Sequence, residues 1–239
     1  MTADLDLASL SKAPNRFALW AQVIADREAH TIAEIGVYRG VFTEAMLVGC
    51  PGITTYYLID PWRHLDDWNK PLNNDDAAFQ EAYDEVMTRT APWERKRVIL
   101  RGRTTEVVDS IPDGSLDVAY IDGDHTLRGI SIDLIRMWQK LRSGGVLGGD
   151  DFTQTIWQHG RRFEPTLVFP FAVFFAEAVG APIVALPHSQ YLIRKLDTGF
   201  SFRDPTGQYG DRTLNAVLRD VGTTSRLAGR LKPTLRREK

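Results

Sequence analysis

Short apolar runs alternate along this chain with segments whose apolar residues recur at helical spacing. The runs are rich in β-branched residues and stop at glycine, proline or acidic residues, which is typical of buried strands that enter turns. The segments between them predict amphipathic helices. The predicted strands lie within 31–40, 54–62, 97–102, 116–124 and 144–152, and the predicted helices within 17–28, 41–50, 75–89, 128–141 and 170–180.

This alternation predicts the fold class. Strands separated by helices form parallel βαβ units, so we expect an α/β fold with a Rossmann-like, doubly wound sheet of about seven strands. Two further runs, 182–187 and 190–195, are separated by only a few residues and predict an antiparallel hairpin at the end of the sheet. Ligands of such sheets bind at the carboxyl ends of the strands, so the residues there are the candidates for function.

The same pattern divides the chain into an N-terminal helical extension (1–30), a central domain (31–195) and a C-terminal extension (196–239). Residues 62–95 form an insertion between the second and third strands, and Trp62 opens it directly after a strand end. An ordinary surface helix explains most of this insertion. A lid or acceptor wall is the functional alternative, because aromatic rings stack on sugars and aromatic substrates.

Charge and cysteine content limit the partners. The 239 residues carry 29 basic and 31 acidic side chains, so no global charge favours a nucleic acid. The basic segment 223–239 is explained by a solvated terminus, and the alternative is a contact with a membrane or an anionic polymer. Cys50 is the single cysteine, no signal peptide is recognisable and no apolar run is long enough to span a membrane, so we expect a cytoplasmic protein.

Glycines follow the first predicted strand, in Glu34-Ile35-Gly36-Val37-Tyr38-Arg39-Gly40. Glycine lets a ligand approach the backbone closely, and the start of the next helix offers free N–H groups. The G-x-G-x-x-G pattern of diphosphate-binding loops is missing because Glu34 occupies its first position, which disfavours a nicotinamide oxidoreductase. Glu34 is instead expected to accept hydrogen bonds from an amino group or water near a cationic cofactor.

Asp60 ends the second predicted strand, at the spacing after Gly36 that dinucleotide-binding folds give to their acidic residue. A carboxylate in this position can accept hydrogen bonds from both hydroxyls of a ribose. The alternative is that Asp60 merely caps the following turn, where aspartate is common. The spacing favours the nucleoside site.

Acidic residues also end the fourth and fifth predicted strands, as Asp122-Gly123-Asp124-His125 and as Asp150-Asp151. Adjacent parallel strands would bring Asp122, Asp150 and Asp151 together. Close carboxylates repel one another unless they are protonated or bridged, and Mg²⁺ or another divalent cation bridges them readily. The alternative is that these aspartates cap helices and hold turns.

These motifs together resemble a known family. EIGVYRG, the acid in LIDPW, YIDGDHT and LRSGGVLGGDDF are similar to the class I S-adenosylmethionine-dependent methyltransferases, specifically the methyltransferase-24 group related to macrocin O-methyltransferase. The resemblance covers about Thr31 to Lys195. It implies that Glu34 and Gly36 flank the methionine part of the cofactor, that Asp60 holds its ribose and that 103–105 lie beside adenine.

The resemblance further implies that Asp122, Asp150 and Asp151 are metal ligands, and the adjacent pair Asp150-Asp151 resembles the sugar-modifying relatives. A small-molecule or saccharide acceptor is therefore expected, and a second copy of the chain is a further candidate partner. The residues predicted to bind the cofactor are Glu34, Gly36, Tyr38, Asp60, Arg103, Thr104, Asp122 and Asp124.

Transfer of a methyl group to a hydroxyl also needs a proton acceptor. His125 is our candidate for this base and acts beside Asp122, because it follows the acidic turn and has an unperturbed pKa near neutrality. The alternative for His125 is an ordinary turn residue or a partner of the aspartates, and His159 or His188 could replace it. Rival functions are a metal-dependent hydrolase that uses the same aspartates and a noncatalytic, cofactor-binding regulatory protein.

Overall fold

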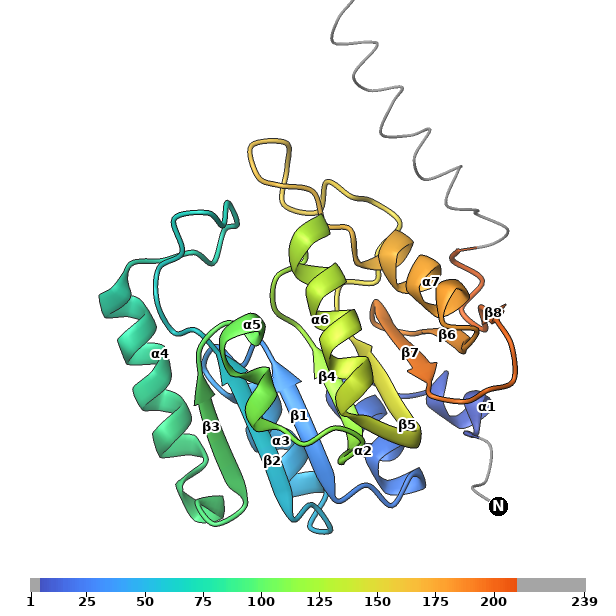
Figure 1. Cartoon of the computed structure of the whole chain (residues 1–239), viewed down its shortest axis with the longest axis horizontal. Coiled ribbons are helices and arrows are strands. Elements are labelled where there is room, and N and C mark those ends of the chain that lie inside the picture. The colour runs from blue at the N-terminus through green and yellow to red at the C-terminus, as the bar shows by residue number, and fades with distance from the viewer. Residues whose placement is uncertain (1–4, 210–239) are drawn as a thin grey trace, which may run out of the picture.

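The computed structural model describes residues 5–209, which build an eight-stranded sheet (Figure 1). The strand order is β3-β2-β1-β4-β5-β7-β6-β8. The first five strands run parallel, whereas β7 is antiparallel to both of its neighbours. The strands are β1 (Thr31–Ile35), β2 (Thr55–Asp60), β3 (Arg97–Arg101), β4 (Leu116–Ile121), β5 (Leu141–Gly149), β6 (Pro182–Leu186), β7 (Gln190–Arg194) and β8 (Ser201–Arg203).

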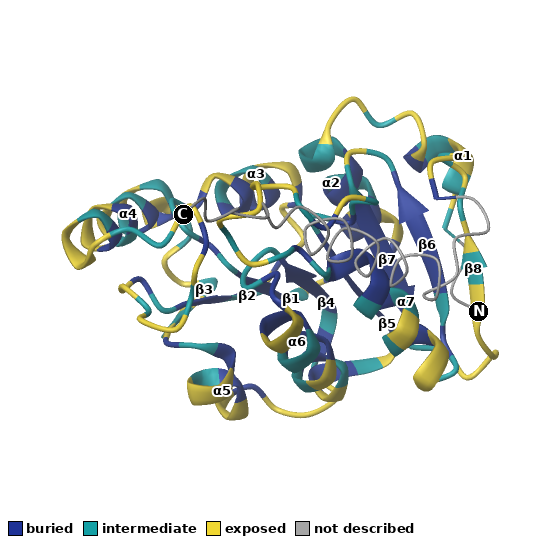
Figure 2. Cartoon of the chain, turned by 90° about the horizontal axis from the view of Figure 1, so that it is seen from above, coloured by how far each residue is buried: buried dark blue, intermediate teal, exposed yellow. Residues whose placement is uncertain are grey.

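Helices cover both faces of this sheet, so its central strands are buried on both sides (Figure 2). One face packs against α2, α3 and α4, and the other against α5, α6 and α7. This burial explains why the strands are continuous apolar runs rather than alternating ones. The helices are α1 (Leu7–Leu10), α2 (Arg16–Asp26), α3 (Val41–Gly49), α4 (Asp76–Arg89), α5 (Thr104–Val107), α6 (Leu127–Lys140) and α7 (Val168–Ala178), with short 3₁₀ turns at Ala91–Trp93 and Val108–Ser110.

The predicted fold class is confirmed, including the terminal hairpin of β6 and β7, in which Ile183 pairs with Ile193. The sheet has eight strands instead of about seven, because Ser201–Arg203 adds β8 beside β6. A strand of three residues at the edge of a sheet carries too short a pattern to be recognised in a sequence.

The helix α2 from the N-terminal extension packs into the same core as the sheet. Asn15 caps its first turn by accepting a hydrogen bond from the backbone N–H of Ala18 at 2.9 Å. Leu19 and Trp20 are fully buried and belong to the cluster on the α2–α4 face of the sheet. The chain before the central domain thus contributes to the layer that covers the sheet.

Within residues 5–209, no helix combines the length and apolar character that a membrane crossing requires. The basic segment 223–239 lies outside the described residues.

Candidate active site

A cavity of about 390 Å³ lies at the carboxyl ends of the parallel strands. The loops 61–75 and 150–167 both rise above this edge of the sheet (Figure 1). Most of the residues predicted from the sequence meet on its wall, although they come from five different strand ends. They are Gly36, Tyr38, Asp60, Arg103, Thr104, Asp122, Asp124, His125 and Asp151.

The turns after β1 and β2 build one end of the cavity. Gly36 has a φ of +85°, and a Cβ atom there would overlap the carbonyl oxygen of Asp122. Asp60 accepts hydrogen bonds from the backbone N–H of Tyr38 at 2.9 Å and of Trp62 at 2.8 Å. Burial raises the pKa of Asp60, and these backbone hydrogen bonds oppose that shift. The carboxylate is thereby fixed where a fold of this kind binds ribose hydroxyls.

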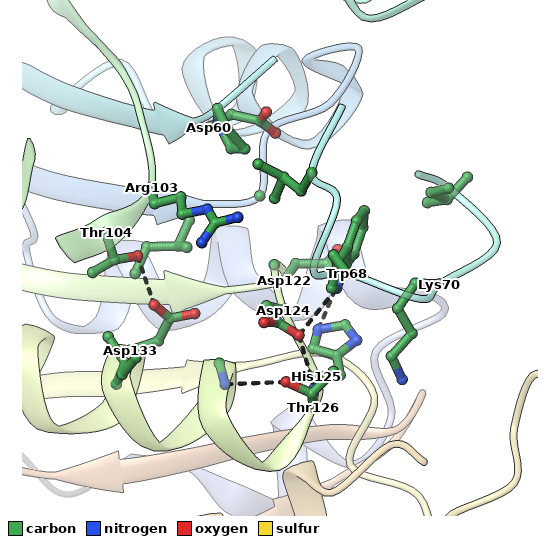
Figure 3. A pocket seen from close by; sticks show the side chains of 18 of the residues that line it. Asp60, Trp68, Lys70, Arg103, Thr104, Asp122, Asp124, His125, Thr126 and Asp133 are labelled. Carbon is green, nitrogen blue, oxygen red and sulfur yellow. Dashed lines mark hydrogen bonds and ion pairs between the residues drawn. The ribbon is translucent and has the colours of Figure 1, made fainter. Parts of the chain in front are cut away.

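Thr104 and Asp133 line the same end of the cavity (Figure 3). The Thr104 hydroxyl donates a hydrogen bond of 2.6 Å to Oδ1 of Asp133, which α6 supplies. Burial raises the pKa of Asp133 to about 7, against the effect of this hydrogen bond. Arg103 pairs with Asp67 from the loop 61–75. This end therefore offers donors and acceptors beside Asp60, which suits a nucleobase.

Asp124 connects the turn after β4 to the loop 61–75 (Figure 3). One of its oxygens accepts hydrogen bonds from the indole Nε1 of Trp68 and from the backbone N–H of Thr126, each 3.0 Å long. The Thr126 hydroxyl caps α6 by accepting from the backbone N–H of Gly129 at 3.2 Å. The turn that carries His125 is thus fixed on both sides.

The buried His125 and the partly buried Asp151 form a pair on the cavity wall. Nδ1 of His125 lies 2.6 Å from Oδ2 of Asp151. Nε2 of His125 lies 3.7 Å from Oδ1 of Asp122 and has no hydrogen-bond partner among the described residues. Burial lowers the pKa of His125, but the hydrogen bond and charge of Asp151 outweigh it and leave the pKa raised. Burial likewise opposes ionisation of Asp151, yet His125 lowers the pKa of this carboxyl to about 2.

Arg16, in the first turn of α2, reaches the carboxylates of Asp122 and Asp150. Its Nη1 atom lies 2.9 Å from Oδ2 of Asp122 and also forms an ion pair with Asp150. Burial raises the pKa of Asp122 to about 7, and the charge of Asp150 adds to this effect, whereas His125 and Arg16 oppose it. The guanidinium therefore supplies the positive charge that two adjacent carboxylates require.

The predicted metal ligands do not fit a metal ion in this arrangement. Asp150 accepts a hydrogen bond from Gln190 at 2.6 Å, and Asp151 accepts one from Gln158 at 2.6 Å, in addition to the pairs with Arg16 and His125. Asp150 also lies outside the cavity wall. Across residues 5–209, no group of three histidine, cysteine or acidic side chains is arranged to hold a metal. In place of the predicted metal site, these residues form a cluster in which Arg16 is the bridging cation.

Two other predicted residues lie behind the cavity rather than on its wall. Glu34 is buried on the α3 side of the sheet and accepts hydrogen bonds from the hydroxyls of Thr43 at 2.7 Å and Tyr56 at 2.9 Å. Burial raises the pKa of Glu34 to about 8. Trp62 is also fully buried, and its indole donates a 2.8 Å hydrogen bond to the carbonyl of Tyr38. Glu34 thus joins β1 to α3 and β2, whereas Trp62 supports the turn after β1 and does not line the cavity as its position indicated.

The loops 61–75 and 150–167, which both contribute to the cavity wall, contact each other. Asn69 donates its backbone N–H to the Glu164 carboxylate at 3.3 Å and accepts the backbone N–H of Glu164 at 3.2 Å. The ammonium of Lys70 is buried and donates to the carbonyl oxygens of Glu164 at 2.9 Å and Pro165 at 3.3 Å. The insertion is therefore joined to the loop 150–167 by polar contacts, and its role as a lid stays a prediction.

Arg16, Lys70 and Asp133 are site residues that the sequence patterns did not lead us to predict. Arg16 carried a signal, because a basic residue in the first turn of a helix opposes the helix dipole unless it has a tertiary partner. Asp133 carried another, since it lies one turn from Ile130 and Met137 on the buried face of α6. Lys70 lies in a loop whose partner is far away in the sequence, and no local pattern marks it.

The order reversal at β1, the cavity at the strand ends and the carboxylate after β2 define a nucleoside-binding fold of the class I methyltransferase type. A family model described as a methyltransferase domain matches residues 33–152, which is half of the chain. The chain therefore belongs to this methyltransferase family, as the motifs indicated.

Solved structures agree with this fold. A protein from Staphylococcus aureus assigned as a caffeoyl-CoA O-methyltransferase superposes with a TM-score of 0.56 at 15% identity, over 80% of this chain and 84% of its own. The methyltransferase PaMTH1 from Podospora anserina, solved with S-adenosylhomocysteine bound, gives a TM-score of 0.55 at 14% identity, over 80% and 82% of the two chains. At these identities the likeness concerns the fold.

One curated relative was found at 25% identity over 169 residues, the uncharacterized protein y4gI of Sinorhizobium fredii. The match covers 65% of this chain but only 17% of that protein.

Proposed function

We propose that this protein is an S-adenosylmethionine-dependent O-methyltransferase that acts on a hydroxyl group of a small molecule. The observation that carries the proposal is the composition of the cavity wall. Gly36, Asp60 and Thr104 line one end, and the His125–Asp151 pair lines the wall further along. A cofactor site and a proton acceptor thus share one cavity, as a methyl transfer to oxygen requires.

S-adenosylmethionine, when bound, supplies an electrophilic methyl group. In our proposal, Asp60 accepts hydrogen bonds from its ribose, while Thr104 and Asp133 face its adenine. Gly36 keeps the backbone of the first turn close to the end of β4, so that the methionine part lies beside Asp122. The donors and acceptors of this end fit such a nucleoside, and the solved relative with S-adenosylhomocysteine supports the same cofactor.

The acceptor must lose a proton as its oxygen attacks the methyl carbon, because an aliphatic hydroxyl is a poor nucleophile at neutral pH. Nε2 of neutral His125 takes this proton in our proposal. Asp151 binds Nδ1–H on the other side of the ring and stabilises the imidazolium that forms. The loops 61–75 and 150–167 cover the cavity in this proposal, exclude water and hold the acceptor in line with the methyl group.

A saccharide is the acceptor class that we favour within this proposal. The cavity wall near His125 carries the indole of Trp68 and the hydrogen-bonding side chains of Gln158, His159 and Glu164. Aromatic rings pack against the apolar faces of sugars, and polar side chains bind their hydroxyls. The combination supports an acceptor rich in hydroxyl groups.

Calorimetry with S-adenosylhomocysteine tests the cofactor assignment. The protein should bind this product, and Asp60→Ala should weaken binding about tenfold or more, whereas Asp84→Asn, at an exposed carboxylate on α4, should not. Incubation of cell extracts with enzyme and a deuterated-methyl cofactor, followed by mass spectrometry, then identifies the acceptor. If the label appeared only in N-methylated products and in no methyl ether, this result would contradict O-methylation.

A further inference from the structure

Arg16 is the feature that the proposed function does not explain. It belongs to α2, outside the segment 33–152 that matches the methyltransferase family. Its guanidinium nevertheless contacts Asp122 and Asp150, which end two neighbouring strands at the cavity. An arginine from outside the family's own motifs thus completes the carboxylate cluster of this chain.

Contacts on both sides of Arg16 in the sequence, and around its guanidinium, fix the position of this side chain. Asn15 caps the helix directly before it, and the carbonyl of Ala13 accepts a 2.7 Å hydrogen bond from His188 in the turn between β6 and β7. The guanidinium lies 5.5 Å from the ring centroid of Phe17 and 6.0 Å from that of Phe42. Such contacts favour a cation in this place.

A second residue of α2, one turn further along, is linked to Asp150 through Gln190 of β7. The indole Nε1 of Trp20 donates to Oε1 of Gln190 at 2.9 Å, and Nε2 of Gln190 donates to Asp150 at 2.6 Å. The backbone N–H of Asp151 donates to the same oxygen of Asp150 at 2.8 Å. Both oxygens of Asp150 are therefore occupied by donors of the protein itself.

Arg16 also supplies the cluster with a positive charge of its own. Its guanidinium faces Asp122 and Asp150, while Asp151 is held by the imidazole ring of His125. A divalent cation placed among these carboxylates would meet the guanidinium at ion-pair distance. Like charges at such separations repel strongly, so the arginine and the metal compete for one place.

We propose that Arg16 replaces the divalent cation at the strand ends, so that this chain orients its acceptor and His125 without a metal ion. The inference rests on the proposed function for its role in methyl transfer, and Arg16 acts in it as a positioning residue through Asp122. Asp122 then stands near Nε2 of His125 as a carboxylate held in place by the guanidinium.

Binding of Mn²⁺ tests this proposal without any assay of activity. Electron paramagnetic resonance of Mn²⁺ reports the free ion, and its signal falls when the ion binds. The full-length protein should leave the signal unchanged up to about 1 mM Mn²⁺, a concentration at which even weak oxygen-ligand sites fill. Arg16→Met should gain a saturable site with a Kd of about 0.1 mM or tighter, because it uncovers Asp122 and Asp150.

Two variants control for structural effects. Arg89→Met breaks the ion pair with Glu44 on the surface of α3 and α4, and it should bind no more Mn²⁺ than the parent protein. Arg16→Lys keeps the charge and should also remain without a Mn²⁺ site. If Arg16→Met does not fold, the titration of the parent protein and of Arg16→Lys decides the question.

The outcomes separate this inference from the proposed function. Saturable Mn²⁺ binding by the parent protein at or below about 1 mM would overturn it, as would a folded Arg16→Met that gains no site. Loss of methyl transfer on addition of EDTA would also contradict it. Failure to bind S-adenosylhomocysteine would instead reject the proposed function, and calorimetry measures that separately.

Discussion

His125 combines two properties that catalytic bases share: one ring nitrogen is held by a carboxylate and the other is unpartnered among the described residues. We predict that His125→Gln lowers the rate of methyl transfer about 10²- to 10⁴-fold, because the acceptor then loses its proton without help. The affinity for S-adenosylhomocysteine, measured by calorimetry, should change less than about threefold.

The matched control is His30→Gln. His30 lies at the opposite end of the sheet, where its Nδ1 contacts the carbonyl of Gly52 at 2.7 Å. This variant should retain the parent rate. Equal rates for His125→Gln and the parent protein would exclude His125 as the base and leave His159, which also lines the cavity, as the next candidate.

Glu34 makes the stability of the protein depend on pH. Burial raises its pKa from 4.5 to about 8, so the folded state holds a proton that the unfolded chain releases above pH 4.5. The free energy of unfolding therefore falls as the pH rises between those two values, by roughly 1.4 kcal/mol for each pH step of one. Glu34→Gln should be more stable than the parent protein at pH 8 and should flatten this dependence.

Urea unfolding at pH 5.5, 7 and 8.5 measures this effect. Glu44→Gln serves as the control, because Glu44 is a partly exposed residue that pairs with Arg89. A Glu34→Gln variant that keeps the parent slope with pH would show that Glu34 is ionised in the folded protein. An unchanged affinity for S-adenosylhomocysteine would support its place behind the cavity wall.

At the scale of elements, the buried ammonium of Lys70 is one of the polar groups that join the loops 61–75 and 150–167. Lys70 donates to carbonyl oxygens of the loop 150–167, and burial lowers its pKa against the nearby acids Asp124, Asp151 and Glu164. Lys70→Met leaves these carbonyls without a donor, at a cost of about 1–3 kcal/mol. We predict faster hydrogen exchange in 155–166 and a KM for the acceptor raised about tenfold.

Lys96→Met is the matched control for this change. Lys96 also donates to a backbone carbonyl, that of Pro51 at 3.0 Å, but it lies outside the cavity wall. It should alter neither the exchange of 155–166 nor the KM. If Lys70→Met leaves the exchange of this loop unchanged, the polar contacts do not hold the cover in place.

The elements also show which parts of this protein a sequence can predict. The strands and the helices between them follow from local periodicity, and Gly36, Asp60 and Asp122 follow from their places at strand ends. The ion pairs of Arg16 join residues more than a hundred positions apart, so no local pattern contains them. Glu34 was mispredicted for a different reason. Its motif correctly identifies the turn after β1, but β1 is buried on both sides, so its apolar pattern does not tell on which face the Glu34 side chain lies.

At the scale of the whole molecule, the methyltransferase segment depends on the helix before it. Trp20 is fully buried against the sheet, packs edge-on against Tyr120 and connects through Gln190 to Asp150. We predict that Trp20→Ala lowers the free energy of unfolding by about 3–5 kcal/mol, the usual cost of removing a buried aromatic side chain. Chemical denaturation measures it.

Phe174→Ala gives the comparison, because the Phe174 side chain on α7 is 50% exposed. Its cost should stay within about 1 kcal/mol. A Trp20→Ala cost as small as that of Phe174→Ala would mean that α2 is an appendage and that residues 31–195 fold without it.

The close approach at Gly36 has a consequence for how such a protein can evolve. A side chain at this position would collide with the backbone of Asp122 and Gly123, so β1 and β4 cannot adjust there independently. The turn after β1 and the turn after β4, to which we assign the cofactor and the base, are therefore coupled and change as one unit. Selection for a new acceptor would act on the loops 61–75 and 150–167, because a substitution at position 36 that changes cofactor affinity would also shift His125.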